Sequence, residues 1–164
     1  SDTVFGFDVN CPYAEMLDTL YRIQGSPAVS GTPLFYVGSS TRTMTGAYQS
    51  AVRWAQDNGL ISDRIWLMDA FTSLTRRDAA VTLRRYAAML GQDVTVDEQT
   101  VTDWRARYPA LSAPEAAALV WCFESSIARL DGSLASVFDA ADQIMPRYYV
   151  MSMIYNYHIM FEVT

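Results

Sequence analysis

Two adjacent arginines, Arg76 and Arg77, are the residues of this 164-residue chain whose type and placement most clearly suggest chemistry. They stand between Thr75 and Asp78, at the start of an amphipathic segment. A helix N-terminus carries unpaired backbone N–H groups and partial positive charge, so cations in its first turn are locally unfavourable. The same N–H groups and a two-pronged guanidinium would stabilise a ligand carboxylate. The pattern therefore predicts either an anion-binding site or ion pairs with protein acids such as Asp69 or Asp78.

Thr75 and Asp78 also fit the start of a helix without any ligand. Threonine is a favoured N-cap residue, and an acid three residues later can accept from the backbone N–H of the cap. Apolar residues then recur at the spacing of one helical face. They are Ala79, Ala80, Leu83, Tyr86, Ala87 and Leu90, before Gly91. We therefore predict a helix over about 75–90 whose first turn carries the candidate site.

Two tryptophans and one histidine are the other side chains that invite a chemical role. Trp54 and Trp121 could each offer a flat ring to a sugar, although their apolar neighbours favour a place in the core. His158 is the single histidine of the chain and has no partner at a recognisable spacing. Cys122 with His158 lacks a third residue that would orient the pair. The sequence therefore predicts no catalytic residue and no enzyme activity.

The composition argues against several classes of function. All 12 basic residues are arginine and the net charge is −6, which disfavours nonspecific nucleic-acid binding and lysine-dependent chemistry. No apolar run reaches the length of a transmembrane span, so we expect none. Cys11 and Cys122 lack the paired spacing of a zinc site, and we predict no metal or cofactor. A buried free thiol is favoured for Cys122, with a single disulfide as the alternative.

The helix pattern that begins at Thr75 recurs on both sides. Pro12 begins PYAEMLDTLYRIQG and Pro146 begins PRYYVMSMIYNYHIMF, and each segment aligns with the sequence from Thr75 onwards without a gap. A second pattern, AVRWAQDNGLIS, has a weaker copy around Trp121. We therefore predict an all-α fold of three pseudo-repeats around a central three-helix bundle, with long connecting loops. The three bundle helices are predicted at about 12–28, 75–90 and 146–161.

One predicted domain covers 1–164, because repeats that each bury too little alone must share one core. We place a partial first repeat at 1–28, a second repeat at 29–92 and a third at 93–164. The polar stretch Asp93–Ser112 is predicted to be a connector with one short helix around Trp104.

AVRWAQDNGLIS followed by SLTRRDAAVTLRRYAAMLG resembles the S-layer homology domain, whose repeats carry an AVxWAxxxGI helix and a helix that starts ITRAE or ITRxD. The resemblance is strong over about 46–91, fair over 12–31 and weak over 114–161. It implies a pseudo-trimer around a three-helix bundle, whose grooves bind a secondary cell-wall polysaccharide of Gram-positive bacteria, often through a pyruvylated sugar. It also implies a secreted, non-catalytic module at the cell surface.

The three copies do not keep the family motif equally. The second copy has threonine, arginine and acid together, whereas the first keeps only the acid, Glu15, and the third keeps only the arginine, Arg147. The resemblance therefore places the glycan chiefly at the second copy. The predicted ligand-binding residues are Arg76, Arg77, Thr75, Asp78, Trp54 and Arg147.

The segment from Tyr148 to Phe161 has more tyrosine and methionine than a core helix requires. Tyr148, Tyr155 and Met160 fall off the face that this segment shares with the helix at 75–90. Aromatic residues and methionine are enriched at protein interfaces. An alternative function is therefore a protein–protein interaction module that has lost glycan binding and uses these residues for a partner or for self-association.

Overall fold

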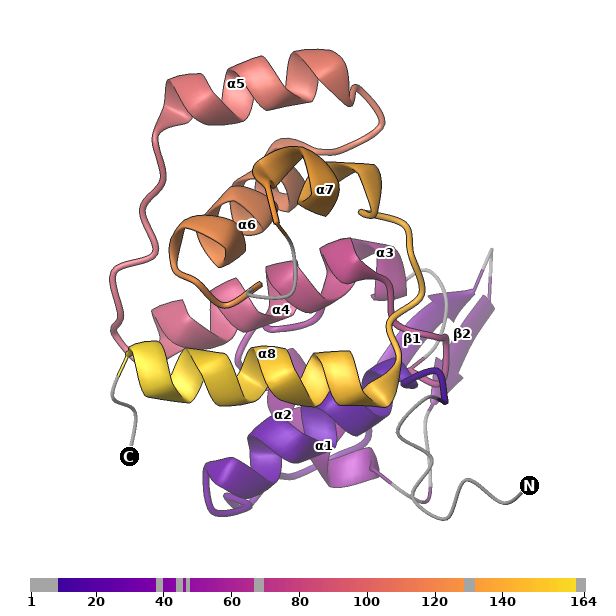
Figure 1. The fold of residues 1–164 in the computed structure, drawn as a ribbon. Coiled ribbons are helices and arrows are strands. Elements are labelled where there is room, and N and C mark those ends of the chain that lie inside the picture. Colours follow the sequence, from indigo (N-terminus) through magenta and orange to yellow (C-terminus); the bar gives the residue numbers. More distant parts are fainter. Residues whose placement is uncertain are drawn as a thin grey trace, which may run out of the picture.

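A computed structural model describes residues 9–37, 40–43, 46, 48–66, 70–128 and 132–161. These residues form eight helices and one antiparallel hairpin (Figure 1). In chain order the elements are α1 (Tyr13–Ile23), β1 (Leu34–Val37), β2 (Ser40–Thr43), α2 (Gln49–Asp57), α3 (Asp63–Trp66), α4 (Arg76–Met89), α5 (Glu98–Arg107), α6 (Ala113–Glu124), α7 (Leu134–Asp139) and α8 (Arg147–Met160). The fold is mostly helical, as predicted, and the hairpin is an addition whose four-residue strands are too short for a clear periodicity.

Three helices, α1, α4 and α8, leave the same side of the molecule and run in the same direction (Figure 1). Each begins within one residue of its predicted start. The predicted end of α1 at about 28 is wrong, because Gly25 and Ser26 adopt φ values of 80° and 50°. This left-handed conformation cannot continue a right-handed helix, so α1 ends at Ile23.

Backbone hydrogen bonds join the three segments that lead into these helices. The N–H of Cys11 donates to the carbonyl of Met145 at 3.0 Å, that of Met145 to Leu74 at 2.8 Å, and that of Leu74 to Cys11 at 2.9 Å. Each residue lies two positions before the first helical residue, and all three are fully buried. We call Cys11, Leu74 and Met145 the helix-start ring, because the three hydrogen bonds form a closed cycle.

A second set of hydrogen bonds joins the same three segments one step outward, and it runs around the ring in the opposite direction. The first helical residue of each helix donates its N–H to the neighbouring segment. The pairs are Tyr13 to Thr72 at 2.9 Å, Arg76 to Gln143 at 3.1 Å, and Arg147 to Val9 at 2.9 Å. The helix starts are therefore tied to one another through backbone groups, whatever side chains they carry.

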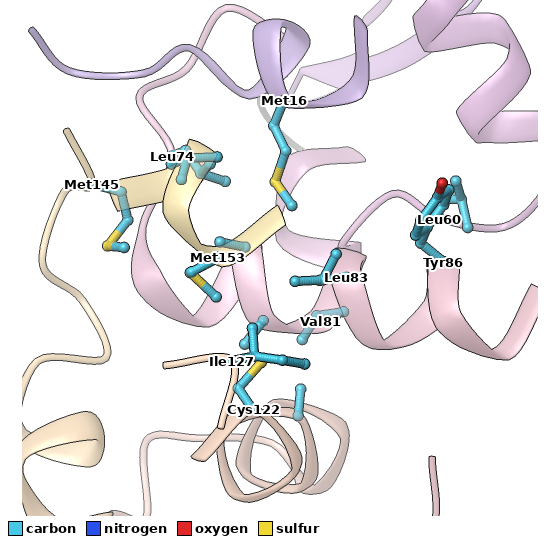
Figure 2. Packing of buried hydrophobic residues seen from close by; sticks show 14 of the residues in the cluster. Met16, Leu60, Leu74, Val81, Leu83, Tyr86, Cys122, Ile127, Met145 and Met153 are labelled. Carbon is cyan, nitrogen blue, oxygen red and sulfur yellow. The ribbon is translucent and has the colours of Figure 1, made fainter. Parts of the chain in front are cut away.

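The apolar core extends on two sides of α4. Met16 of α1 and Met153 of α8 point toward Leu83, while Ile127 and Cys122 approach Val81 from the side of α6 (Figure 2). All of these side chains are buried, and burying one such side chain contributes about 1.5–3 kcal/mol. The central position of α4 explains why most of its residues are buried, including the polar Arg76, Asp78 and Thr82.

Helices α2 and α6 cover the bundle from outside, α2 against α1 and α6 against α4. Helix α5 occupies the connector in which a short helix was predicted around Trp104, and it extends over Glu98–Arg107. Helix α7 was not predicted. Its start is capped by Ser133, whose side chain accepts from the N–H of Ser136, and its six residues give too little periodicity to detect.

The two cysteines are free and buried, so the disulfide alternative is wrong and the free thiol predicted for Cys122 is confirmed. Cys11 belongs to the helix-start ring. Burial, followed by the nearby Glu15 carboxylate, raises the pKa of its thiol to about 12. Cys11 therefore stays protonated at neutral pH and behaves as a small apolar side chain.

Two tyrosines of α8 provide a matched test of this packing. Tyr157 is 0% exposed and contacts Tyr86, whereas Tyr155 is 67% exposed. Tyr157→Ala should lower the free energy of unfolding by about 3 kcal/mol through the loss of buried contacts, while Tyr155→Ala should change it by less than about 0.5 kcal/mol. Urea unfolding followed by circular dichroism measures both. Similar losses for the two variants would contradict the assigned orientation of α8.

Candidate functional site

Arg76 lies inside the protein, where it connects α4 to α8. Its side chain is buried, Nη1 donates to the hydroxyl of Tyr149 at 2.9 Å, and Nη2 donates to Oε1 of Gln143 at 3.2 Å. The guanidinium carbon also lies 4.6 Å from the centroid of the Tyr149 ring, in cation–π geometry. A ligand could reach Arg76 only by displacing these neighbours.

Arg77 forms two ion pairs with carboxylates from other elements. Its Nη2 lies 2.7 Å from Oδ1 of Asp142, and its Nε lies 3.3 Å from Oε2 of Glu115. The Arg77 and Glu115 side chains are only 12% and 13% exposed, so solvent screens this pair less than a pair at an open surface. The acids differ from those expected at the sequence level: Asp78 has other partners, and Asp69 lies outside the described residues.

Thr75 occupies the predicted N-cap position of α4, but the predicted capping box does not form. The Thr75 hydroxyl donates to Oδ2 of Asp78 at 2.7 Å and accepts no bond from the first turn. Asp78 is fully buried, and its Oδ1 accepts from the Ser62 hydroxyl at 2.9 Å. Nη2 of Arg64 donates to Oδ2 at 3.1 Å. Both carboxylate oxygens of Asp78 therefore accept side-chain hydrogen bonds, and neither accepts from the backbone N–H of Thr75 as a capping box requires.

The Arg64–Asp78 pair affects the arginine as well. Its hydrogen bond to Asp78, more than the nearby charges, raises the pKa of the Arg64 guanidinium. Sequence reasoning missed Ser62 and Arg64 because α3, which carries Arg64 and directly follows Ser62, has four residues and gives no periodic signal. Asp78 therefore acts as a structural junction between the start of α3 and α4.

Arg147 pairs with Glu15, at 2.8 Å between Nε and Oε1. The arginine at the start of α8 thus meets the acid in the first turn of α1, and hydrogen bonding to Glu15 raises the pKa of Arg147. Arg76 and Tyr149 follow the same positional rule, because the first helical residue of one helix meets the third helical residue of the next. The side chains at these helix starts therefore pair with one another across the helices.

The third junction follows the same rule through an intermediate residue. Tyr13 is the first helical residue of α1, and Asp78 is the third of α4. Ser62 connects them, since its N–H donates to the Tyr13 hydroxyl at 3.0 Å and its own hydroxyl donates to Asp78. The three junctions are thus related in position although their side chains differ.

Trp54 lies in the core, and its predicted role in stacking on a sugar is wrong. Its ring centroid lies 5.7 Å from that of Tyr21 and 6.5 Å from that of Tyr86, and only 6% of the residue is exposed. Trp121 is similarly buried beside Tyr157 and Phe161. The apolar residues beside both tryptophans in the sequence therefore correctly indicated a place in the core.

A cleft of about 700 Å³ opens next to Arg76 and Arg77. Its lining residues come from the end of α5, from α7 and from the segments that follow them. They are Arg107, Tyr108, Pro109, Ala110, Leu111, Phe138, Asp139, Ala140, Ala141, Asp142 and Gln143. We call it the Tyr108 cleft. Two of its lining residues, Asp142 and Gln143, are the partners of Arg77 and Arg76.

The chemistry of the Tyr108 cleft suits a polar ligand with an apolar face. The Tyr108 ring lies 5.3 Å from Phe138, and its hydroxyl donates to Asp139. Carboxylates and an amide accept and donate the hydrogen bonds that sugar hydroxyls need, and an aromatic ring can pack against a sugar face. Sequence reasoning missed this cleft because α7, which with the segment after it supplies six of the eleven lining residues, gave no periodic signal. The Ser112-x-x-Glu115 capping signature could have located Glu115 at the start of α6.

Four large apolar side chains are exposed along α8. Tyr148 is 49% exposed, Tyr155 67%, Ile159 47% and Met160 44%. Tyr148, Tyr155 and Ile159 are seven and four residues apart, so they follow one stripe of the helix. We call these four residues the α8 stripe. Within the described part of the chain, no helix has the length and hydropathy to cross a membrane.

Comparisons of the chain with protein-family models, with curated proteins and with solved structures find no match.

A pair of aspartates tests the junction at Asp78. Asp78→Asn should lower the free energy of unfolding by about 1.5–3 kcal/mol, the range for hydrogen bonds to a charged group. Asp63→Asn removes an 86% exposed carboxylate that lies 3.5 Å from Arg85, and should cost less than about 0.5 kcal/mol. Guanidinium unfolding curves of the two variants provide the measurement. Equal destabilisation would contradict the structural role of Asp78.

Proposed function

We propose that this protein is a non-catalytic module of the S-layer homology type that binds an acidic cell-wall polysaccharide. The helix-start ring is the observation that carries the proposal. Three segments at equivalent positions bond to one another in one cyclic order, which is the relation expected of three repeats around a common axis. Such an arrangement is what the resemblance of AVRWAQDNGLIS and SLTRRDAAVTLRRYAAMLG to that family implies.

The proposed glycan site is the Tyr108 cleft rather than the arginines themselves. Arg77 is already matched by Asp142 and Glu115, so a ligand carboxylate would have to compete with two protein carboxylates. Arg76 and Arg77 instead hold Gln143 and Asp142 at the wall of the cleft. Thr75, Asp78 and Arg147 act at the junctions between helices and have no direct part in this proposal.

The cleft offers each part of an acidic sugar a matching group. Asp142 has a 67% exposed side chain whose charge is balanced by Arg77, so it can accept from sugar hydroxyls with little repulsion. Tyr108 supplies the aromatic surface. Arg107, which lines the cleft and lies over the Trp104 ring, is the cation placed to meet a pyruvyl carboxylate.

Binding to purified, pyruvylated cell-wall polymer tests this function by isothermal titration calorimetry. Tyr108→Ala should weaken binding at least tenfold, because a tenfold change needs only about 1.4 kcal/mol, within the range of one aromatic contact. Tyr155→Ala removes the same side chain from the α8 stripe and should leave the affinity unchanged. Thermal unfolding of each variant verifies that it is folded at the temperature of the titration.

Two outcomes would contradict the proposal in different ways. No binding by the unaltered protein would reject the function. Equal affinity of the Tyr108→Ala variant and the unaltered protein would reject the cleft as the site.

The α8 stripe favours a second candidate, an interaction module that retains the fold without binding glycan. Four exposed apolar side chains on one helix are an unusual concentration for a free surface. Failure to bind polymer, together with a dimer in sedimentation equilibrium that Tyr155→Ser dissociates, would favour this candidate over the first.

A further inference from the structure

A second cavity, of about 600 Å³, lies between α4, α5 and the start of α6. Its lining residues include two arginines from different elements, Arg84 of α4 and Arg105 of α5, and one acid, Glu98. One face of α5 forms a wall, with Val101 and Thr102 between Glu98 and Arg105. This cavity shares no lining residue with the Tyr108 cleft, so it is a separate place on the protein.

Arg84 is a partly buried cation that has no carboxylate partner in the described part of the chain. Its Nε and Nη2 both donate to the carbonyl of Val94, at 3.1 and 2.9 Å. Burial lowers the pKa of Arg84, although an arginine remains charged at neutral pH. A guanidinium has five N–H donors. The two hydrogen bonds to Val94 therefore fix the plane of the group and leave other N–H groups for a ligand.

Arg105 also bonds to a backbone carbonyl, through one N–H group. Its Nε donates to the carbonyl of Leu111 at 3.2 Å, and no described carboxylate lies within ion-pair distance of it. Most other described arginines do have such a partner, as Arg22 does in Asp18. Two arginines that bond only to carbonyls and line one cavity therefore differ from the usual surface pattern.

The remaining polar groups of the cavity do not compensate this charge. The Glu98 carboxylate forms no ion pair with either arginine. The hydroxyls of Thr95 and Thr102 already donate to Asp93 and to the Glu98 carbonyl. Pro114, at the start of α6, has no N–H to offer. Among the side chains that line the cavity, the two guanidinium groups are thus the donors that remain available to a ligand.

We propose that Arg84 and Arg105 form a binding site for an oxyanion, either a carboxylate or a phosphate group of a small ligand. A planar guanidinium binds both groups through paired N–H donors. The anion would neutralise a cation that the fold has partly removed from water, which makes the interaction stronger than at an open surface. The site stands independently of the glycan proposed for the Tyr108 cleft.

The test follows the arginine Nε–Hε signals of ¹⁵N-labelled protein during titration with sodium phosphate, and separately with sodium pyruvate. Sodium chloride at matched ionic strength is the reference for simple screening. The signals of Arg84 and Arg105 should shift in a saturable manner with at least one of the two anions. Shifts that are equal for all arginines, or that chloride reproduces, would overturn the proposal.

Charge-removing variants then locate the site. Arg84→Gln and Arg105→Gln should each weaken anion binding at least tenfold, while Arg22→Gln, which removes the same charge from the exposed surface of α1, should leave it unchanged. Arg105 is exposed, so its variant tests the site even if Arg84→Gln unfolds the protein. Unchanged binding in the Arg105→Gln variant would also overturn the proposal. The two anion arms show whether the site prefers carboxylate or phosphate.

Discussion

The closed cycle of backbone hydrogen bonds at Cys11, Leu74 and Met145 is the constraint on which the rest of the structure depends. Backbone N–H and C=O groups that are removed from water must find partners, and these three residues are fully buried. The N–H of each residue donates to the carbonyl of another of the three, and the three bonds run around the ring in one direction. The cycle therefore needs all three segments, and it makes α1, α4 and α8 leave the same side of the molecule in parallel (Figure 1).

The same cycle determines which side chains meet. Because the helix starts are related in position, the first helical residue of one helix faces the third helical residue of its neighbour, as in Arg147 with Glu15 and Arg76 with Tyr149. The junctions therefore form although the three helix starts carry different side chains. Arg76 and Arg77 have partners within the protein. In the proposed function they therefore position the Tyr108 cleft.

Sequence reasoning could predict the features that depend on local periodicity. The starts at Pro12, Thr75 and Pro146, the free thiol of Cys122 and the exposed face of α8 all follow from spacing and residue type. These signals arise within one helix and need no knowledge of its neighbours. The mostly helical fold follows from the same patterns.

The features that were missed depend on contacts between distant segments or on elements too short to be periodic. The pairing of Arg77 with Glu115 and Asp142 joins three parts of the chain, and no local pattern identifies those acids as its partners. The Tyr108 cleft needs α7, which has six residues. Trp54 was placed among the candidate ligands through a general property of its ring, whereas its neighbours place it in the core.

Native-state hydrogen exchange at the helix-start ring tests the central claim most directly. The amides of Cys11, Leu74 and Met145 should exchange only through global unfolding, with equal protection and the same dependence on denaturant as the amide of Leu83 within α4. Such agreement would show that the three segments form one cooperative closure. Exchange at Cys11 that is orders of magnitude faster than at Leu74 and Met145 would mean that the first segment opens independently, and would contradict the account.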